Sequence, residues 1–269
     1  MIDWDDAFDN SGYVTGSQNL PQQWAEAAEA VRNVLKNNGR AKLDQAYGSG
    51  DREVYDLFSA VGPAKGTVIF VHGGYWLRFD KSYWSHLAQG CLENGWNVAI
   101  PSYPLAPNAQ IGQITAAVTR AVVEIADVSH GTIALIGHSA GGHLVSRLMC
   151  RGVLPAHVAK RISRVVSVSG VHHLDPLLGT KLNEKLRLTP DEVASESPVH
   201  LSPSPEIQVT IVVGDQERPE FLRQARMLAE RWAAKGADVR TIFEPGTHHF
   251  NVVASLAEVN GMLTKEVLR

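Results

Sequence analysis

The sequence contains few cysteines, and it lacks the long hydrophobic runs of membrane proteins. Its two cysteines, Cys91 and Cys150, lie far apart, and neither belongs to a Cys-x-x-Cys or Cys/His spacing of the kind that holds a metal. We therefore expect two buried thiols in a reducing cytoplasm rather than a disulfide framework. The longest apolar runs, such as residues 68–71, are much too short to cross a bilayer.

The sequence also lacks a strong excess of one charge and a secretory leader. Its 25 lysines and arginines against 28 acidic residues give a net charge of −3, and they form no basic tract that would favour nucleic acid. The acidic residues 1–6 contain no apolar stretch of the kind found in signal peptides. We expect a cytoplasmic protein that acts on a small molecule and binds neither nucleic acid nor membranes. The sequence does not indicate an oligomeric state, and a homodimer is one open alternative.

The hydrophobic pattern predicts one α/β domain over residues 1–269, of which 44% are hydrophobic. Helices are expected over residues 21–37, 82–93, 110–126, 219–234 and 251–267. Strands are expected over residues 41–47, 53–58, 67–71, 97–100, 132–136, 164–169, 207–213 and 238–243. Because strands and helices alternate from residue 67 onward, we expect a mostly parallel sheet covered by helices on both faces. Residues 1–40 are interpreted as an arm and a helix, and the irregular residues 171–205 as a small cap insertion over the site.

A Gly-x-Ser-x-Gly motif spans residues 137–141 and places Ser139 between an apolar strand-like run and a helix-like run. This is the setting of a nucleophile elbow, a turn so tight that we expect the serine to take a positive φ. Glycine at positions 137 and 141 tolerates that geometry because it has no Cβ. The turn would expose the Ser139 hydroxyl and aim the unpaired amides of the following helix at the group that Ser139 attacks.

A serine nucleophile needs a base that removes its proton and an acid that orients the base. In this architecture the acid and the histidine follow later strands, in that order. The loop after the seventh expected strand offers Glu217, which we favour, and Asp215 as the alternative. The loop after the last expected strand offers His249, which we favour because it opens the final helix, and His248 as the alternative.

The oxyanion formed during attack needs backbone donors that are fixed before the reaction. We expect one donor from the amide of Ala140, directly after the serine. Further donors are expected from Gly73, Gly74 and Tyr75 in the loop after the third expected strand, where glycine allows a close approach of the backbone. His72 is expected to brace this loop.

A metal centre is the other chemistry that the histidines would allow. His172-His173 together with His248-His249 would supply imidazoles, but no acidic residue has a suitable ligand spacing. We therefore expect neither a metal nor another cofactor.

With these motifs in place, the chain resembles α/β-hydrolases of the hormone-sensitive lipase-like group over about residues 41–265. The segment His72-Gly73-Gly74-Tyr75-Trp76 is similar to the corresponding loop of kynurenine formamidases, and residues 214–224 and His249-Phe250 resemble their acid and histidine segments. The resemblance implies hydrolysis of N-formylkynurenine to kynurenine and formate. Two positions depart from the pattern: lipase relatives carry a third glycine in place of Tyr75, and animal formamidases carry aspartate in place of Glu217.

Aromatic residues beside the oxyanion loop bear on the substrate. Crowding by Tyr75 and Trp76 would suit a formyl group, the smallest acyl group, and we expect Trp76 and His138 to contact the substrate. Three more aromatic residues would either offer surface to an aromatic substrate or pack in the core: Tyr83, Trp84 and Tyr103. A short-chain carboxylesterase of unknown natural substrate is the alternative function. A non-catalytic binding protein is a third, because the fold alone does not fix the function.

Overall fold

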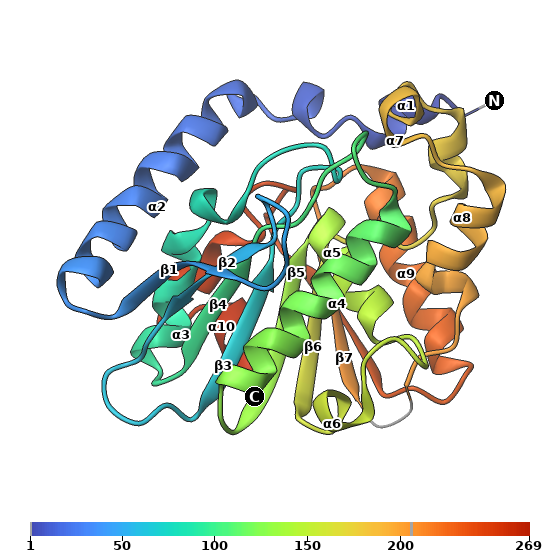
Figure 1. Cartoon of the computed structure of the whole chain (residues 1–269). Helices are drawn as coiled ribbons and strands as arrows, with labels where there is room; N and C mark the ends of the chain where they lie inside the picture. The colour runs from blue at the N-terminus through green and yellow to red at the C-terminus, as the bar shows by residue number, and fades with distance from the viewer. Residues whose placement is uncertain (1, 205–206) are drawn as a thin grey trace.

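The apolar, β-branched runs of the sequence form the centre of one eight-stranded sheet (Figure 1). The computed structural model describes residues 2–204 and 207–269, so the first residue of the predicted arm and the last residue of the predicted cap lie outside the described residues. The strands are β1 (Ala41–Ala46), β2 (Val54–Phe58), β3 (Gly66–Val71), β4 (Asn97–Pro101), β5 (Thr132–His138), β6 (Ile162–Val168), β7 (Gln208–Gly214) and β8 (Val239–Glu244).

The sheet is mixed but mostly parallel, as predicted. Its strand order is β1-β2-β4-β3-β5-β6-β7-β8. The pairs β1–β2 and β2–β4 are antiparallel, and every other neighbouring pair is parallel. The inner strands β3, β5 and β7 are buried along almost their whole length because helices cover both faces, whereas half-buried and exposed residues are mixed along the edge strands β1 and β8.

From β3 onward, helices and 3-10 turns fill the connections between the strands. The α-helices are α1 (Trp4–Phe8), α2 (Leu20–Asn37), α3 (Gln89–Glu93), α4 (Ile111–Val128), α5 (Ala140–Leu148), α6 (Ala156–Ala159), α7 (Asn183–Leu186), α8 (Pro190–Glu196), α9 (Pro219–Ala233) and α10 (Met262–Leu268). The 3-10 turns are η1 (Ser11–Tyr13), η2 (Ser17–Asn19), η3 (Lys81–Tyr83), η4 (Ser85–Ala88), η5 (Asp175–Gly179), η6 (Pro198–His200) and η7 (Ala254–Ala257).

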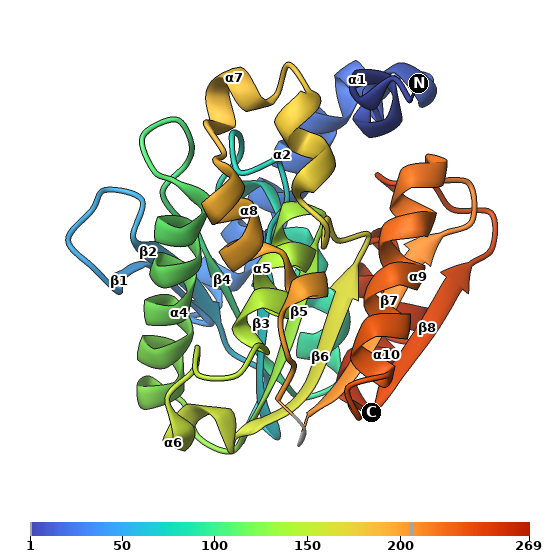
Figure 2. The same ribbon diagram turned by 90° about the vertical axis from the view of Figure 1, so that its right-hand side faces the viewer.

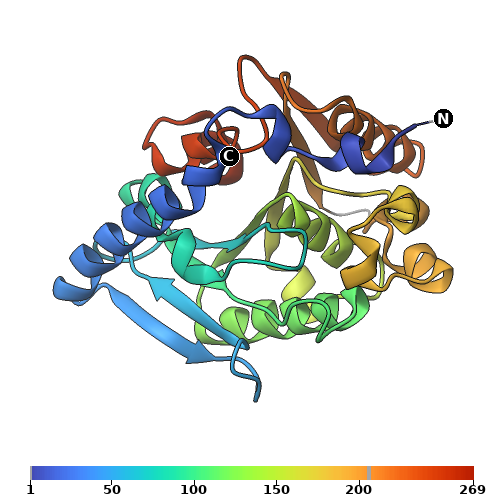
Figure 3. The same cartoon turned by 90° about the horizontal axis from the view of Figure 1, so that it is seen from above.

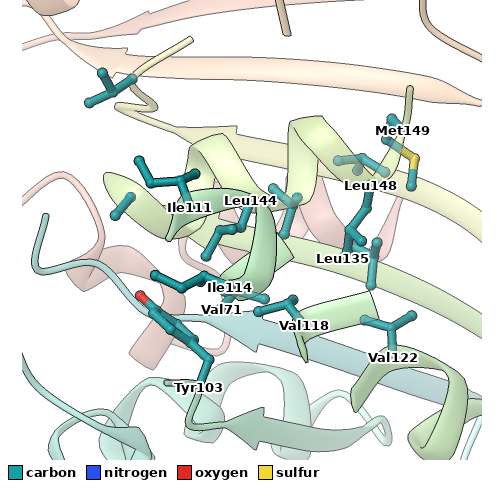
Figure 4. Close-up of a cluster of buried hydrophobic side chains, with 14 of the residues drawn as sticks. Val71, Tyr103, Ile111, Ile114, Val118, Val122, Leu135, Leu144, Leu148 and Met149 are labelled. Atoms are coloured by element: carbon teal, nitrogen blue, oxygen red, sulfur yellow. The ribbon is translucent and has the colours of Figure 1, made fainter. Parts of the chain in front are cut away.

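Two hydrophobic cores lie on opposite faces of the sheet. One is built by α4, α5, α8 and α9, and the other by α2, α3 and α10. The view from above places α4 on one side of the sheet and α2 with the C-terminal helix on the other (Figure 3). Figure 4 shows part of the first core, where residues of α4 and α5 pack over the sheet: Ile111, Ile114, Val118, Val122, Leu144 and Leu148 with Val71 and Leu135.

Residues 82–93, predicted as one helix, instead form η3, η4 and the short α3. The chain leaves helical geometry at Trp84, whose φ is −124° and ψ 3°. The Trp84 side chain is buried, and its ring centroid lies 4.9 Å from that of Trp24 and 6.2 Å from that of Phe70. Packing of this indole in the core therefore outweighs the local helix propensity that the sequence shows.

The predicted final helix, residues 251–267, is also interrupted. It consists of η7 and α10, with Gly261 between them. A Cβ on Gly261 would lie 1.7 Å from the carbonyl oxygen of Ser255, so the chain can fold back on η7 only where the side chain is absent. The prediction of helical structure in this segment was therefore correct, but the prediction of one continuous helix was wrong.

The two segments without a clear hydrophobic period lie together beyond the carboxyl ends of the strands. Residues 3–13, which we call the N-terminal arm, contain α1 and η1, and α1 lies against η5 of the predicted cap, which Figure 2 shows between α1 and α7 (Figures 1 and 2). The amide of Lys181 in the cap donates to the Asp5 carboxylate in the arm at 2.7 Å. The arm therefore contains helical turns and is folded against the cap.

The two cysteines lie in the interior of the fold. Cys91 and Cys150 are free and buried, and burial raises the pKa of each thiol to about 12. Across residues 2–204 and 207–269, no helix combines the length and the apolar character needed to cross a bilayer.

Candidate active site

Ser139 lies on a tight turn between β5 and α5. Its φ is 55° and its ψ −117°, in agreement with the positive φ expected of an elbow. Such a conformation costs a residue with a side chain about 1–3 kcal/mol, so the surroundings must hold it. The Ser139 amide donates to the carbonyl of Val168 at 2.8 Å. A Cβ at Gly137 would lie 2.1 Å from the carbonyl oxygen of Gly141, and one at Gly141 would lie 2.0 Å from that of Val71, so the turn requires both glycines.

The Ser139 hydroxyl, the His249 ring and the Glu217 carboxylate form one hydrogen-bonded line. His249 Nε2 lies 3.1 Å from Ser139 Oγ, and His249 Nδ1 lies 2.7 Å from Glu217 Oε2. All three residues are buried. Because an ionised carboxylate only accepts, Nδ1 carries the proton and Nε2 can accept the proton of the Ser139 hydroxyl.

Glu217 is held in its ionised form by several donors. Its Oε1 accepts hydrogen bonds from the Ser169 hydroxyl and, at 2.9 Å, from the Gly214 amide. Burial opposes ionisation, but the charge and hydrogen bond of His249 together with these donors outweigh it and hold the pKa of the Glu217 carboxyl below its usual value. The buried carboxylate is thus positioned to orient the His249 ring.

The two alternative residues make other contacts. Asp215 is exposed, and its Oδ1 accepts from the amide of Gly246 at 2.8 Å. The amide of His248 donates to the Asn251 side chain at 2.7 Å, and its Nδ1 accepts from the amide of Phe250 at 3.2 Å. Both residues therefore close local turns, whereas Glu217 and His249 form the hydrogen-bonded line with Ser139.

The four histidines considered for a metal centre do not come together. Within the described residues, the one group with metal-like spacing joins His173 to Asp175 and His200, whose two Nε2 atoms each lie 2.9 Å from Asp175 Oδ2. Arg223 lies 3.2 Å from His173 Nδ1, and Arg231 lies 3.3 Å from His200 Nδ1. Since arginine only donates, both Nδ1 atoms accept and both Nε2 protons point to the carboxylate, an arrangement that leaves no imidazole lone pair for a shared metal.

The loop after β3 lies directly against the elbow. A Cβ on Gly73 would lie 2.9 Å from the carbonyl oxygen of His138 and 3.0 Å from Ser139 Cβ, so only glycine permits this approach. Gly74 has a φ of 115°, and a Cβ there would lie 2.4 Å from the carbonyl oxygen of Arg78. The backbone of this loop therefore comes as close to the serine as the sequence predicts.

The predicted donors of an oxyanion hole have free amides. Of the described residues, none provides a backbone acceptor to the amides of Gly73, Gly74 or Tyr75. Ala140 is the first residue of α5, where the amide has no partner within the helix. These amides are available to a negatively charged oxygen on a group bound at Ser139.

His72 and Tyr103 brace the loop from behind. His72 Nδ1 donates to the carbonyl of Gly73 at 2.8 Å, and the Tyr103 hydroxyl donates to the carbonyl of His72 at 2.7 Å. The two rings stack at 4.3 Å between centroids. Burial lowers the pKa of His72 to about 4, so this ring is neutral near pH 7 and holds the loop without proton transfer.

A cavity of about 860 Å³ opens beside Ser139 and His249. Gly74, Tyr75 and His138 lie in its wall. Its aromatic lining consists of Phe8, Trp24, Phe79, Trp84 and Phe250 besides Tyr75. Its charged lining consists of Asp5, Asp9, Arg78, Lys181, Glu184 and Lys185. Four residues of the segment 171–205 thus line the cavity: Lys181, Leu182, Glu184 and Lys185.

The structure corrects the placement of Trp76. Tyr75 and Trp76 both have positive φ values, 52° and 56°, and this turn leaves Tyr75 in the cavity wall while Trp76 is fully buried in the core. The Trp76 ring packs edge-on against His143 at 5.1 Å. His138, the other predicted substrate contact, lines the cavity, and its Nε2 lies 2.8 Å from the carbonyl of His249.

Sequence reasoning missed three contributors to the site. Phe8 and its neighbours in the arm line the cavity, although no motif marks them. Ser169, at a positive φ of 51°, reaches Glu217 from the end of β6. The Phe221 ring lies 4.5 Å from the His249 ring. Of these residues, only Ser169 could have been suspected from the sequence, because it is a small polar residue at the end of a predicted buried strand.

Comparison with known proteins places the chain among related enzymes. A family model described as BD-FAE matches residues 60–154. The kynurenine formamidase of Danio rerio is 30% identical over 255 residues, which cover 91% of this chain and 84% of that enzyme. The chain belongs to the kynurenine formamidase family.

Solved structures of similar fold include two hydrolases. A Silicibacter protein whose assignment as a thioesterase is provisional shares 44% identity with this formamidase-family chain, covers 100% of both chains and has a TM-score of 0.95. Esterase B of Lactobacillus rhamnosis is 16% identical, covers 93% of this chain and 91% of its own, and has a TM-score of 0.68. The second likeness shows the α/β-hydrolase fold.

Proposed function

We propose that this member of the formamidase family is a serine hydrolase that cleaves N-formylkynurenine to kynurenine and formate. The hydrogen-bonded line from Glu217 through His249 to Ser139 carries the proposal, because it ends at a hydroxyl in the wall of a cavity. The formamidase of Danio rerio supports the choice of substrate.

The first half of the reaction forms a formyl-enzyme. His249 Nε2 takes the proton of the Ser139 hydroxyl while Ser139 Oγ attacks the formyl carbon. The carbonyl oxygen becomes an oxyanion that accepts hydrogen bonds from the free amides of the loop after β3 and of Ala140. When the C–N bond breaks, His249 returns the proton to the departing arylamine nitrogen, and the formyl group stays on Ser139 as an ester.

The second half repeats these steps with water. His249 removes a proton from the water as the water oxygen attacks the formyl ester. The tetrahedral intermediate then collapses, the proton on His249 passes to Ser139 Oγ, and formic acid leaves and releases its remaining proton to the solvent as it becomes formate. Glu217 remains ionised throughout and stabilises the protonated His249 ring at each transfer.

The cavity suits an aromatic substrate with a small acyl group. Tyr75 and His138 line the cavity together with Ser139, and Trp24, Phe79 and Trp84 add aromatic surface to its wall. A volume of about 860 Å³ lies within the range of pockets that hold small ligands.

Hydrolysis of a short-chain ester or thioester is the second candidate. The provisional thioesterase assignment of the 44% identical Silicibacter relative favours it. The same proton transfers serve an oxygen or sulfur leaving group, so only the substrate side of the cavity distinguishes the two functions.

Comparative kinetics test the proposal. We expect kcat/KM for N-formylkynurenine to exceed the values for p-nitrophenyl acetate, p-nitrophenyl butyrate and acetyl-coenzyme A. A higher kcat/KM for an ester or the thioester would favour the second candidate. Ser139→Ala should abolish turnover of every substrate and the labelling by a fluorophosphonate probe, and retained activity would refute the mechanism for both.

A further inference from the structure

The N-terminal arm touches several parts of the site that are far apart in sequence. Its residues Phe8 and Asn10 line the cavity. Asp5 accepts a hydrogen bond from the cap, and Asp6 pairs with Arg218, which directly follows Glu217 in sequence. The arm is thus connected to the cap and to the loop that carries the acid.

The most direct of these connections reaches the oxyanion loop through a side chain. The Tyr75 hydroxyl donates to the backbone carbonyl of Phe8 at 2.6 Å and accepts from Asn10 Nδ2 at 3.5 Å. Burial raises the pKa of Tyr75 well above its ordinary value, so the hydroxyl keeps its proton and remains a donor. Tyr75 therefore combines an amide that has no acceptor among the described residues with a hydroxyl that is fixed to the arm.

The backbone of this loop needs such support. Tyr75 and Trp76 are consecutive residues with side chains at positive φ, a conformation that persists only where neighbouring structure holds it. Trp76 is held by burial in the core, whereas Tyr75 is partly exposed to the cavity. The hydrogen bond to Phe8 is the polar contact that fixes the outer end of the Tyr75 side chain.

The Phe8 residue also contacts the other side of the site. Its side chain is buried and packs edge-on against Phe221 at 6.1 Å between ring centroids. Phe221 in turn packs against the His249 ring at 4.5 Å. One arm residue thus lies between the loop that offers the oxyanion donors and the aromatic residue behind the base.

We infer that the Tyr75 hydroxyl is a positioning group, which uses the Phe8 carbonyl of the N-terminal arm to hold the oxyanion loop in its reactive geometry. Tyr75 acts here through its own backbone amide and that of Gly74, without its hydroxyl touching the substrate. The inference rests on the proposed function, because it assumes that these amides stabilise an oxyanion on the group attached to Ser139.

Tyr75→Phe removes the hydroxyl and keeps the ring. We expect kcat to fall about tenfold with KM within about twofold, since a neutral hydrogen bond of ordinary strength is lost in support of the transition state. Affinity for a trifluoromethyl ketone, whose adduct with Ser139 carries an oxyanion, should weaken by a similar factor. Affinity for the product kynurenine should stay unchanged.

Tyr13→Phe is the matched control. Tyr13 belongs to the same arm, and its hydroxyl donates to the exposed Asp6 carboxylate, away from the oxyanion loop. We expect this variant to keep the wild-type kcat. Equal losses of kcat in the two variants would mean that only the stability of the arm matters, and a wild-type kcat in Tyr75→Phe, with or without a lower thermal midpoint, would also overturn the inference.

The wild-type protein separates this result from failure of the proposed function. If wild-type protein neither turns over substrate nor reacts with the fluorophosphonate at Ser139, the proposed function fails. If it does both while Tyr75→Phe binds the trifluoromethyl ketone with wild-type affinity, only the positioning role fails.

Discussion

Glu217 and Asp215 lie two residues apart in one loop, yet their carboxylates have different partners. Glu217 contacts His249, and Asp215 caps the turn at Gly246. We expect Glu217→Gln to lower kcat by about 10⁴, as in the serine-protease precedent where the amide favours the wrong histidine tautomer. Asp215→Asn is the control and should change kcat only slightly. Steady-state kinetics that show the larger loss in Asp215→Asn would contradict the assignment.

Ser169 adds a fourth residue to the hydrogen-bonded line of Ser139, His249 and Glu217. Its buried hydroxyl donates to Glu217 Oε1, which also accepts from the Gly214 amide. Ser169→Ala should therefore weaken the hold on the carboxylate and lower kcat about 10- to 100-fold, the size of one hydrogen bond to a charged group. Ser163→Ala, an exposed position on the same strand, is the control. Equal kcat values for the two variants would show that the Gly214 amide suffices.

At the scale of elements, the loop after β3 combines a restricted backbone with a functional role. Gly74→Ala would place a Cβ at a positive φ and 2.4 Å from the carbonyl oxygen of Arg78. We expect the displaced amides to lower kcat by about 10²–10³, the cost of one lost oxyanion donor, while the circular dichroism spectrum remains native. Gly236→Ala is the control, because Gly236 also has a positive φ but has open space around it. A normal kcat in folded Gly74→Ala would exclude this loop from the mechanism.

Elements were predictable from the sequence where one local property decided them. The runs that form β3, β5 and β7 are mostly apolar because these strands are covered on both faces. The breaks at Trp84 and Gly261 were not predictable, because they depend on the Trp24 ring and the Ser255 carbonyl, which come from other elements. The turn at Ser139 was predictable, because its geometry depends on two neighbouring glycines that the sequence itself shows.

The site was predictable in part for the same reason. Ser139 and the loop Gly73–Gly74 follow strands that the sequence reveals, so their approach could be expected from strand order alone. The inward Trp76 and the contact of Phe8 with Tyr75 depend on how the chain turns after β3 and on where the arm folds back. No local pattern encodes either arrangement.

For the whole molecule, buried histidines predict sensitivity to acid. Burial lowers the pKa of His72 and His143 to about 4 and of His138 and His172 to about 3, below the ordinary value of about 6.5 in the unfolded chain. Between these values the unfolded chain binds more protons than the folded chain, so the free energy of unfolding falls as the pH falls from about 6.5 toward 4. Each histidine contributes up to about 1.4 kcal/mol per pH unit.

Urea unfolding at several pH values measures this dependence. The midpoint should be nearly constant between about pH 7 and 8 and fall steeply below about pH 6, because all four groups act in the same direction. His172→Gln removes one of these groups and should make the fall less steep. A midpoint that stays level down to pH 5 would contradict the prediction.

Because both native thiols are buried, the folded chain should react only slowly with thiol-labelling reagents. Alkylating reagents attack the thiolate, and at a pKa of about 12 only about one thiol in 10⁵ is ionised at pH 7. A cysteine placed at Ile2, which is 61% exposed and directly precedes the N-terminal arm, would react with a maleimide long before Cys91 or Cys150. A fluorophore attached there would report the position of the arm during turnover without removal of either native cysteine.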